Sequence, residues 1–148
     1  MRISILLVLL IVGFSSCDKK GDQNQIDQDI ILQYIADHNL NAIEAESGLY
    51  YVVNNPGTGD ACTAASKVKA TYKGYLTNGN VFDEGTIDNF FLSNAIVGWQ
   101  IGIPKFKEGG DGILLIPSAI GYGSSGSSSG SIPPNAVIIF EVELIKVY

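Results

Sequence analysis

The stretch that decides the fold covers residues 122–144 and reads YGSSGSSSGSIPPNAVIIFEVEL. Tyr122 opens a loop of glycine and serine, the loop ends in Ile132-Pro133-Pro134, and a segment that contains Phe140 follows. The loop carries no acidic or basic side chain. Tyr122, Ile132 and Phe140 could line one hydrophobic pocket. The loop itself supplies no catalytic acid, base or nucleophile.

The segment after the two prolines alternates between apolar and acidic side chains. We expect one face of a strand to point inward and the other outward, with Ile138, Phe140, Val142 and Leu144 inside and Glu141 and Glu143 outside. This period of two predicts a half-buried antiparallel strand.

Other segments also read as strands: LYYVV at residues 49–53, the alternating residues 68–76 and ILLI at residues 113–116. Asn78-Gly79 is a strong hairpin signal. Several strands, one short helical turn near Trp99 and no βαβ spacing predict an α+β fold, in which an antiparallel sheet packs on little helix. The twist of such a sheet leaves a concave face on which aromatic side chains form a pocket.

Composition limits the function classes. A chain of 148 residues has room for one modest domain, and a net charge of -6 argues against a nucleic-acid partner. His38 is the only histidine, and a solvated helix-end residue is favoured over a metal ligand because no second ligand accompanies it. The turn EGGDG at residues 108–112 lacks the Lys-Ser/Thr of a phosphate loop. We expect neither a metal nor a cofactor.

The N-terminus reads as a secretory signal. Arg2 precedes the apolar run ISILLVLLIVGFSSC, which ends at Cys17. FSSC at residues 14–17 resembles the bacterial lipobox, which implies cleavage before Cys17 and its acylation; a plain signal peptide and an uncleaved anchor are the alternatives. We therefore expect a lipid-anchored protein of the bacterial cell envelope, facing the periplasm or the exterior. Cys62 then lacks a partner and is expected to be an unreactive loop thiol.

Four regions are predicted along the chain. They are a lipoprotein signal peptide (1–16), a flexible tether (17–26), an N-terminal helix with a linker (27–47) and a β-rich domain (48–148). The helix is predicted from an apolar stripe formed by Ile26, Ile30, Tyr34, Ile31 and Ile35. Asp27 or Asp29 is expected near its start, where a carboxylate suits the helix dipole. Residues 124–131 are expected to form a flexible loop tip.

Four segments in order resemble the FKBP family, the tacrolimus-binding peptidyl-prolyl cis/trans isomerases. They are VKATYKGYLTNGNVFDEG (68–85), IVGWQIGI (96–103), LLIPSAIGYG (114–123) and SIPPNAVIIFEVELIKV (131–147). Each motif alone is weak, and their joint occurrence in order carries the resemblance. The helix followed by ESGLYYVV at residues 46–53 also resembles the lipoprotein branch of this family.

The resemblance implies a sheet wrapped around a short helix, with the active pocket between them. The implied catalytic residues are Tyr72, Phe82, Asp83, Tyr122 and Phe140. The implied substrate-binding residues are Phe90, Ala95, Ile96, Trp99 and Ile132. Between Phe90 and Phe91 we choose Phe90 as the pocket residue. Ala95 replaces the usual valine, and Pro104 is expected to end the short helix early.

The implied activity is prolyl cis/trans isomerisation that assists the folding of envelope or secreted proteins. This activity requires no proton transfer or covalent step, which fits a sequence without a nucleophile–base pair. The alternative is a non-catalytic FKBP-like module or holdase that binds proline-containing segments. A purely structural envelope lipoprotein is disfavoured, because the chain carries all of the aromatic residues that the implied pocket needs. The implied partners are proline-containing polypeptides and macrolides of the tacrolimus class, and we expect a monomer.

Overall fold

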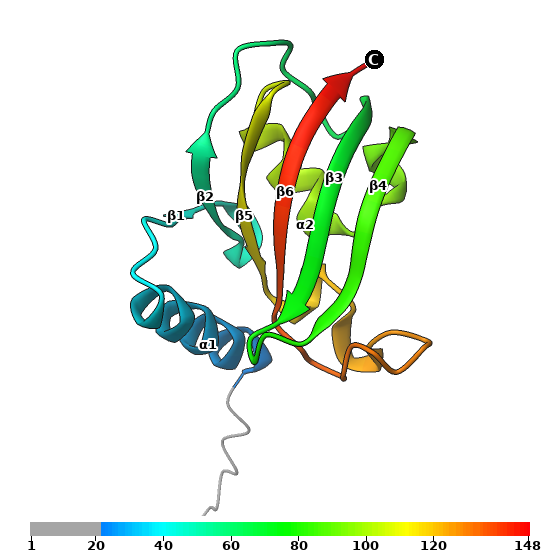
Figure 1. Cartoon of the computed structure of the whole chain (residues 1–148). Helices are drawn as coiled ribbons and strands as arrows, with labels where there is room; N and C mark the ends of the chain where they lie inside the picture. The colour runs from blue at the N-terminus through cyan, green and yellow to red at the C-terminus, as the bar shows by residue number, and fades with distance from the viewer. Residues whose placement is uncertain (1–21) are drawn as a thin grey trace, which may run out of the picture.

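The computed structural model describes residues 22–148, and it shows a curved antiparallel sheet with helices on both faces (Figure 1). The six-stranded sheet has the order β1-β2-β5-β6-β3-β4. Its strands are β1 Ile43–Glu44, β2 Tyr50–Asn55, β3 Lys67–Leu76, β4 Val81–Phe91, β5 Gly110–Ile116 and β6 Ile138–Val147. The helices are α1 Gln23–Asp37 and α2 Val97–Gly102. The predicted α+β architecture, with an antiparallel sheet around a short helix, is confirmed.

Each face of the sheet has its own apolar cluster. The short helix α2 lies behind the sheet in the view of Figure 1, and its Trp99 and the neighbouring Ile103 join inward side chains of β5 and β6. On the opposite face, Ile31 of α1 packs with Tyr50 and Leu115. The alternation predicted for β6 is observed, since Phe140 is buried while Glu141 is exposed. The helix α1 thus covers part of the outer face and leaves residues such as Glu141 exposed there, while α2 marks the face that carries the pocket.

Two glycines allow α2 to approach β5 closely. A Cβ atom at Gly98 would lie 2.6 Å from the side chain of Ile116, and one at Gly102 would lie 2.7 Å from that of Leu114. Such separations are shorter than van der Waals contact, so larger residues at either position would push α2 off the sheet. The helix ends at Gly102, and Pro104 lies in the 3-10 turn η3 (Ile103–Lys105) that follows, as its sequence position predicted.

The helix α1 begins earlier than predicted. It starts at Gln23, so residues 23–26 are helical rather than part of the tether. Its N-cap is Asp22, whose carboxylate accepts a hydrogen bond from the Asn24 backbone N–H (3.3 Å). Asp27, which was expected near the start of the helix, lies one turn inside it, and the helix begins four residues before the predicted start at residue 27. Polar residues at the first turn hid the start of the helix, because they obscure the apolar periodicity on which the prediction relied.

The apolar stripe of α1 is only partly used. Ile31 is fully buried, whereas Ile26 and Ile30 remain 42% and 38% exposed. Within residues 22–148 no helix is long and apolar enough to cross a membrane. Cys17 and the predicted signal peptide lie outside the described residues.

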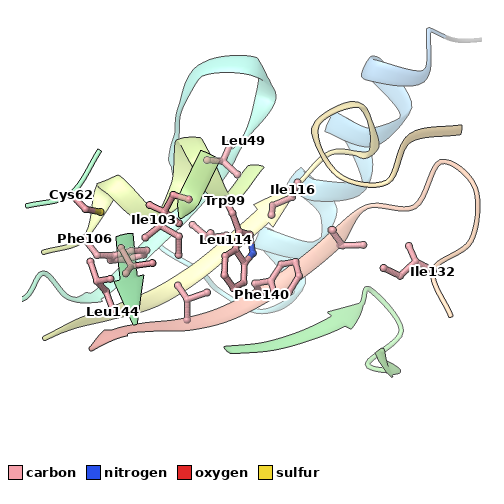
Figure 2. Close-up of a cluster of buried hydrophobic side chains, with 14 residues drawn as sticks. Leu49, Cys62, Trp99, Ile103, Phe106, Leu114, Ile116, Ile132, Phe140 and Leu144 are labelled. Atoms are coloured by element: carbon pink, nitrogen blue, oxygen red, sulfur yellow. The ribbon is translucent and has the colours of Figure 1, made fainter. Parts of the chain in front are cut away.

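Cys62 lies in the same buried apolar cluster as Ile103 and Phe106 and not on an exposed loop surface. Its side chain is buried, and burial raises the pKa of its thiol (Figure 2). The thiol is unpaired within the described residues. This environment agrees with the expectation of an unreactive cysteine, because the thiolate is the reactive form and burial disfavours it.

Candidate functional site

A cavity of about 230 Å³ opens between the concave face of the sheet, the start of α2 and the segment after β5. Its walls come from β3, β4, β6 and α2 together with the segments that follow β4 and β5. The lining residues are Tyr72, Asp83, Ile87, Phe90, Asn94, Ala95, Ile96, Trp99, Tyr122 and Phe140. The fold thus brings together all of the predicted site residues except Phe82 and Ile132, which lie next to this cavity.

The base of the cavity is a set of aromatic rings in edge-to-face contact. The ring centroid of Trp99 lies 5.2 Å from those of Tyr72 and Phe140, with interplanar angles of 79° and 81°. Figure 2 shows the Trp99 indole beside the Phe140 ring within the apolar cluster. Both side chains are buried. Because such contacts and burial leave few rotamers available, the aromatic floor is preorganised before any ligand enters.

Phe82 supports this floor from the side. Its ring centroid lies 5.5 Å from that of Phe140 at an angle of 86°. Gly74, which pairs with Phe140 across β3 and β6, makes the contact feasible, because a Cβ atom there would lie 2.6 Å from both rings. Phe82 also lines a neighbouring hollow of about 510 Å³. Phe82 is therefore a packing partner of the floor and a wall of the adjoining hollow.

Two phenol groups face the cavity. The Tyr72 hydroxyl donates a hydrogen bond to Oδ2 of Asp83 (2.9 Å). Burial, followed by this hydrogen bond, raises the pKa of Tyr72. Burial, followed by the negative charge of Asp83, also raises the pKa of Tyr122. Both hydroxyls therefore remain protonated donors at neutral pH.

The two phenols differ in what they bind. Tyr72 is already paired with Asp83, whereas the Tyr122 hydroxyl has no hydrogen-bond partner within residues 22–148. Tyr122 is 37% exposed, so its hydroxyl is accessible at the rim of the cavity. Tyr122 is thus the phenol that is free to donate to a ligand carbonyl.

A backbone donor lies at the start of α2. The side-chain amide of Gln100 donates to the Ala95 carbonyl oxygen (2.8 Å), which fixes the Ala95–Ile96 peptide plane. The Ile96 N–H belongs to this same plane and points in the opposite direction, because the peptide is trans and planar. The sequence did not predict a role for Gln100, since a glutamine on a short helix carries no distinctive signal. Its contact shows how the chain orients a donor at the pocket.

The glycine–serine loop is hydrogen-bonded rather than open. Ser127 donates its backbone N–H to the Ile132 carbonyl (3.0 Å), and its hydroxyl accepts from the Ile132 N–H (2.9 Å). Gly126 has a φ of +67°, and a Cβ atom there would lie 2.3 Å from the Ile132 carbonyl oxygen. These contacts hold Ile132, which is buried, beneath the adjoining hollow. The loop predicted as a flexible tip is therefore closed by specific bonds between its ends.

The structure distinguishes the two neighbouring phenylalanines. Phe90 lines the cavity, whereas Phe91 is 44% exposed and lies under the Lys67 ammonium at 4.6 Å from its ring centroid. Ile87 and Asn94 also line the cavity and were not predicted. Ile87 belongs to the edge strand β4, most of which is exposed, so its sequence lacks the alternation that reveals an inward face.

Other candidate sites are weaker. A hollow of about 640 Å³ on the outer face of the sheet is larger, but Tyr72 is its one aromatic lining residue, and the lining also includes the charged residues Lys73, Glu141 and Glu143. Within residues 22–148 no group of three His, Cys, Asp or Glu side chains converges in a metal-binding arrangement. The aromatic cavity is therefore the better candidate for a site that binds an apolar group.

Comparisons with known proteins agree with this geometry. The protein-family model described as FKBP-type peptidyl-prolyl cis-trans isomerase matches residues 59–145. A probable FKBP-type peptidyl-prolyl cis-trans isomerase of Haemophilus influenzae is 40% identical over 106 residues, which are 69% of this chain and 44% of that protein. The FK506-binding protein of Neisseria meningitidis serogroup B is 40% identical over 99 residues, which are 62% of this chain and 89% of that protein.

Two crystal structures share the fold. A peptidyl-prolyl cis-trans isomerase of Pseudomonas syringae has a TM-score of 0.75 and 29% identity, covering 84% of this chain and 92% of that chain. FkpA of Escherichia coli has a TM-score of 0.70 and 30% identity, covering 84% of this chain and 62% of that chain. This chain spans less than half the length of several of its relatives. By its sequence match and its fold, the chain belongs to the FKBP-type peptidyl-prolyl cis-trans isomerase family.

Proposed function

We propose that this protein catalyses the cis/trans isomerisation of Xaa-Pro bonds in polypeptides and thereby assists the folding of envelope or secreted proteins. The observation that carries the proposal is the aromatic cavity, in which Trp99 forms the floor and a free phenol and a backbone N–H lie at the rim. Membership in the isomerase family supports the same reaction.

The chemistry follows from the character of an amide. Resonance gives the C–N bond a rotational barrier of roughly 18–20 kcal/mol, and an uncatalysed Xaa-Pro bond isomerises over tens to hundreds of seconds. Rotation breaks the resonance, so the twisted amide is less dipolar than the planar one. An apolar pocket that excludes water disfavours the planar form relative to the twisted form, which lowers the barrier. The bond rotates without any covalent or proton-transfer step.

The polar groups supply orientation. In the proposed complex the prolyl ring lies on Trp99, the Tyr122 hydroxyl donates to one substrate carbonyl, and the Ile96 N–H donates to a second one. Asp83 acts at the reacting carbonyl, either by polarising its carbon or by holding Tyr72 in place through their hydrogen bond. Fixing the ends of the substrate while its amide rotates reduces the entropic part of the barrier.

A protease-coupled assay on an Xaa-Pro peptide tests the proposal, because the protease cleaves only the trans isomer. We expect the protein to accelerate the slow cis-to-trans phase in proportion to its concentration. Peptide binding without acceleration would instead identify a non-catalytic binding module or holdase. If the peptide neither binds nor isomerises faster, the cavity does not have the proposed function.

The proposal includes a membrane anchor. The basic residue, apolar run and FSSC sequence that end at Cys17 support acylation of that cysteine and a location in the bacterial envelope. Growth of the producing bacterium with labelled palmitate, comparing the full chain with Cys17→Ser, tests the anchor. We expect label in the full chain alone, and equal labelling of both would reject Cys17 as the acylated residue.

Two further properties belong to this proposal. We expect a macrolide of the FK506 class to compete with peptide for the cavity, because a relative that is 40% identical is named for FK506 binding. We also expect a monomer. A competition titration followed by Trp99 fluorescence tests the first property, and light scattering over a concentration series tests the second. Macrolide binding that leaves peptide binding unchanged would reject the competition. A measured mass of two chains would reject the monomer.

A further inference from the structure

Asp27 of α1 is a fully buried carboxylate outside the aromatic cavity. Its Oδ2 atom accepts two hydrogen bonds from Ser118, one from the backbone N–H (2.7 Å) and one from the hydroxyl (2.6 Å). Its Oδ1 atom accepts from the side chain of Gln23 (2.7 Å). Asp27 and Ser118 are 0% and 2% exposed. A buried carboxylate with short, charge-assisted bonds fixes the orientation of the group that donates to it.

Ser118 begins the turn that leads to the free phenol of the cavity. The 3-10 turn η4 (Ser118–Ile120) follows Pro117, and the Ser118 carbonyl accepts from the Gly121 N–H (3.0 Å). Tyr122 is the next residue. The orientation of Ser118 therefore sets the direction in which the chain enters Tyr122.

The other end of this segment is tied down as well. The Gly123 carbonyl accepts a hydrogen bond from the Asn135 N–H (2.8 Å), which joins it to the chain just after the two prolines. Tyr122 is thus held between the Asp27–Ser118 bonds on one side and the Gly123–Asn135 bond on the other. Only the first of these anchors comes from the N-terminal helix.

We infer that Asp27 is a positioning residue for the cavity and that it acts on Tyr122 through Ser118. The inference rests on the proposed isomerase function, in which the Tyr122 hydroxyl orients the substrate. It assigns a role to α1 although α1 contributes no residue to the cavity lining. Without Asp27 the two donors of Ser118 are buried and unpaired, so the turn must move to find other acceptors, and Tyr122 moves with it.

The experiment is a double-mutant cycle. The first pair compares Asp27→Ala with the unchanged chain. The second pair compares Tyr122→Ala with the double variant Asp27→Ala/Tyr122→Ala, in which the side chain that Asp27 positions is absent. We expect Asp27→Ala to lower kcat/KM on an Xaa-Pro peptide about threefold in the first pair, as much as loss of the Tyr122 hydroxyl itself, and to leave it nearly unchanged in the second, because coupled residues are not additive. Equal losses in both backgrounds would overturn the inference.

Two variants separate positioning from general damage. Asp27→Asn keeps an acceptor for Ser118, since the half-buried side-chain amide of Gln23 can turn so that its oxygen accepts from the new amide, and we expect this variant to retain most of the activity. Asp29→Ala removes an exposed carboxylate from the same helix, which contacts Gln25 and not Ser118, and we expect no change. All assays are run well below the unfolding temperature of each variant. A loss in Asp29→Ala equal to that in Asp27→Ala would contradict the specific role of Asp27.

A second readout does not depend on catalysis. In NMR spectra of the full chain, the ring ¹³C–¹H signals of Tyr122, assigned by their loss in Tyr122→Phe, report its position. We expect these signals to shift in Asp27→Ala and to stay in place in Asp27→Asn and Asp29→Ala. Unshifted signals in Asp27→Ala would refute the inference even if the protein is an isomerase. Shifted signals in a chain without isomerase activity would uphold the coupling and reject only the proposed function.

Discussion

The Tyr72 hydroxyl donates to Asp83 Oδ2 across 2.9 Å, and this bond joins β3 to β4 directly at the cavity. Neighbouring strands place the two side chains together, since Gly85 is opposite Tyr72 and Gly74 is opposite Asp83 in the register. The bond uses one carboxylate oxygen of Asp83 and keeps the Tyr72 ring in edge contact with Trp99. Asp83 is therefore the one charged group in the cavity lining, and it already has a structural partner.

Asp83→Ala should reduce isomerase activity more than Tyr122→Phe. A hydrogen bond to a charged group contributes about 1.5–3 kcal/mol and one between neutral groups about 0.5–1.5 kcal/mol. About 1.4 kcal/mol corresponds to a tenfold change in rate. We therefore expect kcat/KM to fall about tenfold or more for Asp83→Ala and about threefold for Tyr122→Phe. Steady-state kinetics on one peptide checks both values.

The matched control for Asp83 is Glu84→Ala, which removes the adjacent exposed carboxylate of β4 outside the cavity lining. It should leave kcat/KM unchanged. If Asp83→Ala, Tyr122→Phe and Glu84→Ala have the same activity, the polar part of the site assignment is incorrect.

Gly74→Ala should damage the aromatic floor without touching a polar group. The added Cβ atom would lie 2.6 Å from the rings of Phe82 and Phe140. Overpacking of a core typically costs about 1–3 kcal/mol, so we expect that loss in the free energy of unfolding and weaker peptide binding. Denaturant titration and a peptide-binding titration measure the two effects.

Gly85→Ala is the control for this substitution, because its Cβ atom would meet nothing closer than the Tyr72 hydroxyl at 3.8 Å. It lies on β4, the strand that pairs with β3. We expect a much smaller change in stability than for Gly74→Ala. Equal stability of the two variants would mean that the rings near Gly74 yield easily and that the floor is not rigid.

The alkaline pH dependence follows from the raised pKa values of Tyr72 and Tyr122, which burial causes in both cases. A pKa that is higher in the folded than in the unfolded chain means that folding favours the neutral phenol. The resulting stabilisation is fully present below the unfolded tyrosine pKa of about 10 and is lost as the pH rises through the folded pKa. Activity should therefore be constant across neutral pH and fall only above about pH 10.

Tyrosinate absorbance checks this point, with the folded chain compared with the chain in denaturant over the same pH range. The folded chain should form less tyrosinate at pH 10. A loss of activity centred at or below the unfolded tyrosine pKa, with the fold intact, would show that neither phenol is protected in the cavity.

Cys62 should resist thiol reagents in the native protein. Burial raises the pKa of its thiol, so the thiolate is scarce at pH 8, and the side chain is also inaccessible. A Cys17→Ser chain, in which Cys62 is the only thiol, should react slowly with a disulfide reagent in buffer and rapidly in denaturant. Fast reaction under native conditions would contradict the buried position.

The strands and the aromatic walls could be predicted because their signals are local or ordered along the chain. Phe140 is on an alternating strand, Asn78-Gly79 marks a hairpin, and the tyrosine that opens the loop precedes the two prolines. The family pattern joined these local signals into one pocket. The structure then placed Phe90, and not Phe91, against that pocket.

The missed features depend on contacts between distant residues. Asp27 was expected near the helix start because a carboxylate suits the helix dipole. Its partner Ser118 is far along the chain, so no local pattern links the two residues. Gln100 acts through a side-chain bond to the backbone of a residue one turn earlier. Ser127, which bonds to Ile132, is one of several serines in its loop, so the sequence does not distinguish it from its neighbours. Such bonds become visible only when the chain is folded.

The most direct test of the central claim is NMR exchange spectroscopy on an Xaa-Pro peptide, with separate signals for its cis and trans isomers. Without protein these signals do not exchange on the timescale of seconds, because isomerisation takes tens of seconds or longer. We predict that catalytic amounts of the full chain produce exchange cross-peaks and that Asp83→Ala weakens them at equal protein concentration. Peptide signals that shift or broaden on binding, while the cis and trans signals never exchange, would contradict the account.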